Sequence, residues 1–81
     1  MNAYLRSKYA IQALHDQAMS MMEATYAPIN LAVRMSDQRR AMLEDLMEQG
    51  LLRQEDTKAV ITVAGINELL ERLIEVQAKI S

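Results

Sequence analysis

The side chains with the clearest capacity for chemistry are the arginines near the middle of the chain. Arg34, Arg39 and Arg40 lie close together, with Asp37 as the single acidic residue among them. Guanidinium groups suit phosphate oxygens and the acceptor edge of guanine, so this segment is a candidate for local contact with nucleic acid. The alternative is a solvated helix end whose arginines pair with nearby carboxylates, a contact of little energetic value.

Other chemistry has little support in the sequence. The chain has no cysteine and a single histidine, His15, so neither thiolate chemistry nor a histidine cluster is expected. Its serines form no arrangement with histidine, and no glycine-rich phosphate loop is present. We expect a protein that is not an enzyme and that needs no cofactor and no metal ion. His15 itself is expected to be a half-exposed residue of a helix.

Length and composition predict one small domain over residues 1–81. A chain of this size buries about 60% of its unfolded surface and is only marginally stable alone. Phenylalanine and tryptophan are absent, so aliphatic residues and seven methionines must form the core. Met19, Met21 and Met22 are expected to fill that core rather than to form a binding surface. No segment resembles a membrane span or a signal peptide, and we expect a cytoplasmic protein.

Apolar spacing predicts that most of the chain is helical. Residues 3–24 contain neither glycine nor proline, and their apolar side chains recur on one helical face. This pattern predicts a long first helix over 3–24. Pro28 then interrupts the pattern, because proline is tolerated in a first helical turn but not inside a helix. Residues 27–49 are expected to form a short helix-turn-helix whose first helix covers 29–35.

The helix after the turn has recognisable ends. Ser36 is the expected N-cap, and Gly50 is expected to end the helix in the left-handed region. A β-hairpin is predicted over 51–63, because a charged tip there is followed by a run of the β-branched residues that strands favour. A last helix is predicted over 64–80, beginning near Thr62.

The last helix carries an apolar seam with alternating spacings of 3 and 4 residues. The seam consists of Ile66, Leu69, Leu73, Val76 and Ile80. One interpretation is a contact within the chain, against the first helix. The other is an interface between two copies, because both end helices have broader apolar stripes than so small a core needs. We expect a homodimer through this seam.

The order of the elements and two short phrases resemble the winged helix-turn-helix transcription regulators of the MarR or PadR type. In that family the recognition helix ends in a leucine-rich phrase, L-x-x-L-x-x-x-G-L. The matching residues here are Leu43, Leu46, Gly50 and Leu51. The wing of that family often ends in L-T-x-A/E-G-x-x-L-L. The similar residues here are Ile61, Thr62, Ala64, Gly65, Leu69 and Leu70. The resemblance covers roughly residues 27–73.

The resemblance implies a mainly α fold with one small β-hairpin, and a DNA-binding surface made by the third helix and the hairpin. The first turns of that helix would enter a major groove, and the wing would lie near phosphates. The residues implied in contact with double-stranded DNA are Ser36, Gln38, Arg39, Arg40, Arg53 and Lys58.

Two functions follow from these observations. The leading prediction is a small dimeric DNA-binding transcriptional regulator. The alternative is a small helical protein–protein interaction module, such as a phage-type or secretion-type adaptor or inhibitor, that presents a methionine-rich groove and binds no DNA. The acidic balance of charge, with a net charge of −2, favours the alternative. So does the acidic run Glu44, Asp45 and Glu48, which would repel phosphates if it faced a duplex.

Overall fold

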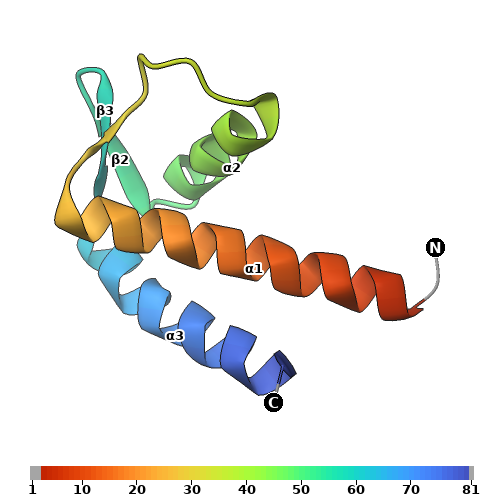
Figure 1. Cartoon of the computed structure of the whole chain (residues 1–81). Helices are drawn as coiled ribbons and strands as arrows, with labels where there is room; N and C mark the ends of the chain where they lie inside the picture. Colours follow the sequence, from red (N-terminus) through yellow and green to blue (C-terminus); the bar gives the residue numbers. More distant parts are fainter. Residues whose placement is uncertain (1–2, 81) are drawn as a thin grey trace.

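The computed structural model describes residues 3–80, and the side chains of residues 10–78. In this part of the chain, helices alternate with a small antiparallel sheet (Figure 1). The elements are α1 (Ala3–Tyr26), β1 (Ile29–Asn30), α2 (Asp37–Glu48), β2 (Leu52–Glu55), β3 (Lys58–Ile61) and α3 (Val63–Ile80). The strand order is β1-β3-β2, so β3, the last strand along the chain, is central in the sheet and pairs with both others. The predicted mainly helical fold with a small hairpin is confirmed at this level.

The two long helices, α1 and α3, lie side by side and run in opposite directions, while α2 lies on the other side of α1 (Figure 1). The core forms where these helices meet the sheet. Its most deeply buried members come from α1, α2, β2 and β3, and are Ala18, Met21, Leu43, Leu46, Leu52 and Ala59. Aliphatic residues and methionine therefore do form the core, as the composition requires. Met21 is fully buried and Met22 packs partly buried against the core, which confirms their predicted role.

The hairpin predicted over 51–63 is present as β2 and β3. Leu52 pairs with Ile61, and Glu55 pairs with Lys58 at the tip. Asp56 takes a positive φ of 60° in the turn between them, a conformation that aspartate tolerates better than most residues. Inward-facing Leu52 and Ala59 are buried, so the hairpin is stabilised by packing on the helices rather than by its own pairing.

The short helix predicted over 29–35 is wrong. Ile29 pairs with Ala59, which places residues 29 and 30 in the sheet as a third strand. The Asn30 side chain then accepts a hydrogen bond from the Ala32 amide at 2.9 Å, a local turn that competes with helix formation. The Leu31 amide donates to the Thr57 carbonyl at 2.8 Å. Tertiary pairing therefore overrides the apolar spacing, and the expected helix-turn-helix over 27–49 lacks its first helix.

Both predicted ends of α2 are confirmed. The Ser36 hydroxyl accepts the Arg39 amide at 3.1 Å, which makes Ser36 the N-cap. At the other end, Gly50 has a φ of 78° and its amide donates to Met47, while the Leu51 amide donates to Leu46. This pair of bonds is the Schellman arrangement, which needs a residue that tolerates positive φ.

The seam predicted as an interface is largely used inside the chain. Leu69 and Val76 are buried, and Leu73 packs partly buried against the core. The intermolecular assignment is wrong for Leu69 and Val76, because α3 needs them to pack on the rest of the chain. Ile66 is half exposed, and the Ile80 side chain lies outside the described residues.

Candidate functional site

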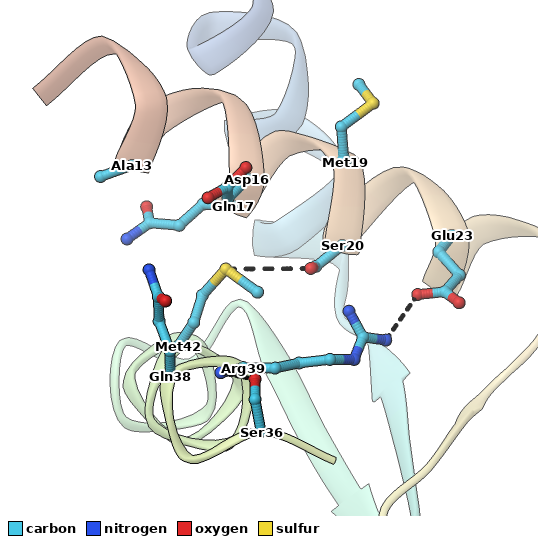
Figure 2. A pocket seen from close by; sticks show the side chains of 10 residues that line it. All are labelled: Ala13, Asp16, Gln17, Met19, Ser20, Glu23, Ser36, Gln38, Arg39 and Met42. Atoms are coloured by element: carbon cyan, nitrogen blue, oxygen red, sulfur yellow. Dashed lines mark hydrogen bonds and ion pairs between the residues drawn. The ribbon is translucent and has the colours of Figure 1, made fainter. Parts of the chain in front are cut away.

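A groove of about 590 Å³ separates the middle of α1 from the first turns of α2 (Figure 2). Its size lies within the range of small-ligand and peptide sites. The wall from α1 consists of Ala13, Asp16, Gln17, Met19, Ser20 and Glu23, and the wall from α2 consists of Ser36, Gln38, Arg39 and Met42. Of the loop over residues 31–36, only Ser36 lines the groove.

An ion pair connects the two walls. Arg39 Nη2 lies 2.9 Å from Glu23 Oε2, and both side chains are partly solvent-exposed (Figure 2). Such a pair fixes the direction of the arginine but adds little to stability. It also leaves the Arg39 guanidinium facing α1 rather than the outside of α2.

The deep part of the groove is lined by the Met42 sulfur and the Ser20 hydroxyl. Ser20 is 3% exposed, and its hydroxyl lies 3.9 Å from Met42 Sδ, a weak acceptor (Figure 2). Methionine at this position gives an adaptable apolar surface. The expectation that Met19 fills the core is wrong: it is 39% exposed, and Figure 2 shows its side chain pointing away from α2, at the rim of the groove.

The Gln17 amide is the polar group in the groove with bonding capacity to spare. Its Oε1 atom is buried, and within the described residues it has no hydrogen-bond partner. A buried acceptor without a donor costs free energy. Gln38 extends from α2 into the same space (Figure 2). Nearby, Asp16 accepts from Gln12 at 2.9 Å and lies 3.6 Å from His15, whose side chain is 52% exposed as expected.

The six residues expected to contact DNA do not form one outward surface. Ser36 is the N-cap, and Gln38 and Arg39 line the groove toward α1. Arg40 turns back to the loop, where its guanidinium donates to the Leu31 carbonyl at 3.3 Å and to the Val33 carbonyl at 3.4 Å.

The remaining two expected contacts, Arg53 and Lys58, are exposed on the hairpin, apart from the start of α2 (Figure 1). Arg53 forms an ion pair with Glu55 on its own strand. The register also sets Lys58 opposite Glu55. The cations of the hairpin are therefore balanced locally by at least one carboxylate.

The outward face of α2 is acidic. Leu43 and Leu46 fix the buried side of this helix, and the exposed residues on the opposite side are Asp37, Ala41, Glu44, Asp45 and Glu48. In a major groove these four carboxylates would approach phosphates, which is unfavourable. The acidic run noted in the sequence does face solvent.

The α1 wall was not expected from the sequence. Gln17, Ser20 and Glu23 lie in a helix that looked like a core element, off the apolar face predicted for it. Within residues 3–80 no group of carboxylates and imidazole is arranged to hold a metal ion. No helix in that part of the chain is both long and apolar enough to span a bilayer.

No protein-family model matches the chain, and neither a curated protein nor a solved structure matches it. Functional inference therefore depends on the geometry of the groove and the charge of its surroundings.

Proposed function

We propose that the chain is a protein–protein interaction module that holds an amphipathic segment of another protein in the groove between α1 and α2. The observation that carries the proposal is the groove itself. It combines apolar surface from Ala13 and Met42 with the unpartnered Gln17 oxygen. Helix-in-groove recognition uses this combination of apolar anchors and a few positioned polar groups.

The charge around the groove favours a basic partner. Asp16 lies on the α1 wall, and the outer face of α2, which turns away from the groove, carries four carboxylates. Complementary charge speeds association and selects partners more than it adds affinity. The proposed ligand is therefore an amphipathic helix with an apolar stripe and flanking lysine or arginine residues.

Selection from a displayed library of amphipathic helical peptides tests this proposal. Enriched peptides are expected to be basic and to bind the wild-type chain. Ala13→Arg places bulk and positive charge in the groove, and should weaken their binding at least tenfold, about 1.4 kcal/mol. Ala64→Arg makes the same change at an exposed position of α3 and is the matched control. If no peptide is enriched, or if the enriched peptides bind Ala13→Arg and Ala64→Arg equally well, the proposal is contradicted.

A second candidate is the DNA-binding regulator of winged helix-turn-helix type. The order of α2, hairpin and α3 favours it, together with the exposed cations Arg53 and Lys58 on the hairpin. In that function two copies would bind half-sites about 10 base pairs apart. The acidic outer face of α2 makes this the weaker proposal.

Selection from random DNA duplexes at low salt distinguishes the two functions. The interaction module is expected to enrich no sequence motif. A motif that is lost in Arg53→Ala/Lys58→Ala would instead support the DNA-binding regulator, because these exposed side chains can be removed without disturbing the core. Arg39 and Arg40 are poorer probes, since their removal also breaks contacts to Glu23 and to the loop.

A further inference from the structure

An apolar stripe on α3 faces solvent. Val63 is 77% exposed, Ile66 49%, Leu70 64% and Ile74 69%. Their spacings of 3, 4 and 4 residues place them on one side of the helix. This stripe is distinct from the side of α3 that holds Leu69 and Val76, which is buried in the chain.

The exposure is concentrated rather than scattered. The other large apolar side chains exposed among the described residues are Met19, Tyr26 and Val33, on α1 and in the loop. Single exposed apolar residues are normal on protein surfaces, but a continuous stripe marks a contact surface. At roughly 100 Å² for each side chain, the stripe offers about 400 Å².

We propose that this stripe, Val63, Ile66, Leu70 and Ile74, is a homodimer contact in which two copies of α3 pack antiparallel about a two-fold axis at Leu70. The stripe is self-complementary in that arrangement. Leu70 meets Leu70 of the second copy, and Ile66 meets Ile74 of the second copy on both sides of the axis. No charged side chain belongs to the stripe. A two-fold contact is the commonest way for a surface to pair with itself.

The charged edge of the stripe favours the antiparallel arrangement over the parallel one. Glu71 is exposed beside Leu70. In the parallel pair, each Glu71 would lie against the other copy's apolar edge, where burying a carboxylate is costly. In the antiparallel pair, both Glu71 side chains lie on the same solvated edge, about 3 Å apart along the helix axis. The two carboxylates repel each other there, but both remain hydrated.

The contact is expected to be weak. A standard interface buries about 800 Å² on each partner, roughly twice what the stripe offers. We expect a dissociation constant no tighter than the micromolar range, since affinity depends on packing quality as well as on area. The inference does not rest on the proposed function, because the stripe and the α1–α2 groove use different residues. A dimer would carry two grooves.

Sedimentation equilibrium of the full chain, from about 1 to several hundred micromolar, tests the dimer. The wild-type mass is expected to rise toward twice that of the monomer. Leu70→Glu should weaken association at least tenfold, while Tyr26→Glu, at an 85% exposed position off the stripe, should not. Glu71→Gln removes the repulsion and should strengthen association several-fold. Leu70 is exposed within one chain, so circular dichroism of Leu70→Glu should show an intact fold.

Cysteine cross-linking tests the direction of the helices, and no native cysteine can form competing disulfides. Leu70→Cys lies at the axis and should form a disulfide-linked dimer on mild oxidation. Val63→Cys should not, because the two copies of this position would be about 21 Å apart along the axis. A monomeric mass at every concentration, an unchanged dimer in Leu70→Glu, or equal cross-linking of both cysteine variants would overturn the proposal.

Discussion

Gly65 lies against the backbone of Leu51, so closely that a Cβ atom added to Gly65 would be 2.1 Å from the Leu51 carbonyl oxygen. The same oxygen accepts the Thr62 amide at 3.1 Å and the Thr62 hydroxyl at 3.0 Å. The start of α3 is therefore fixed on the corner between α2 and β2, and neither backbone can withdraw without breaking these bonds. A side chain at position 65 has no space.

Gly65→Ala is expected to destabilise the fold by about 2–4 kcal/mol, measured by urea unfolding. Alanine would favour the helix by about 1 kcal/mol, but the backbone clash outweighs that gain. Gly50→Ala is the matched control. Gly50 has open space around its Cβ position and a φ of 78°, so only backbone strain of about 1 kcal/mol is expected there. Equal losses in the two variants would contradict the close approach at Gly65.

The Thr62 hydroxyl is expected to hold the same corner. Its one hydrogen is shared between the Gly50 carbonyl at 2.7 Å and the Leu51 carbonyl at 3.0 Å, and its oxygen accepts the Gly65 amide at 3.0 Å, so it caps α3 and connects α3 to the end of α2. Thr62→Val keeps the shape but removes these bonds, and should cost about 1–2 kcal/mol. Thr62→Ser retains the hydroxyl and should stay within about 0.5 kcal/mol of wild type in the same unfolding assay. Loss of equal size in both would contradict the role of the hydroxyl, because serine keeps it.

The same substitution to alanine should change the unfolding free energy strongly at Leu46 and hardly at all at Leu70. Leu46 is 0% exposed at the centre of the core, and Leu46→Ala should cost about 2–5 kcal/mol because it leaves a cavity. Leu70 is 64% exposed, and Leu70→Ala should change the unfolding free energy by no more than about 0.5 kcal/mol at a concentration where the chain is monomeric. A large loss at Leu70 would mean that the side of α3 facing the core is misassigned.

The features of the fold that sequence reasoning predicted are local ones. The cap at Ser36, the helix end at Gly50 and the hairpin around residues 51–63 each depend on residues within one turn or one tip. Their conformational preferences act wherever the rest of the chain lies.

The features that were mispredicted depend on distant pairing. Residues 29–35 have helical spacing, yet Ile29 joins the sheet because Ala59, thirty positions later, offers a strand edge. The groove could not be predicted for the same reason, because its two walls come from α1 and from the start of α2, which are distant in the chain. The seam on α3 contained the right kind of residue, but burial shows that the solvent-facing stripe is shifted to Leu70 and Ile74.

The loop over residues 31–36 is expected to depend on Arg40. Its guanidinium donates to two loop carbonyls, those of Leu31 and Val33, and holds the loop over the end of the sheet. Arg40→Ala should cost about 1 kcal/mol of global stability, since these bonds are partly exposed to water. The larger effect should be local. Hydrogen exchange at the Leu31 amide, which donates to Thr57, should accelerate more than exchange in α3.

Arg40→Lys gives a sharper version of this test. Lysine keeps the charge but lacks the planar fork that reaches both carbonyls, so exchange of the loop should remain faster than in wild type. Arg53→Ala removes an exposed arginine of the hairpin and should leave the loop unchanged. If Arg40→Lys protects the loop as well as arginine does, the charge at position 40 and not its geometry is what orders residues 31–36.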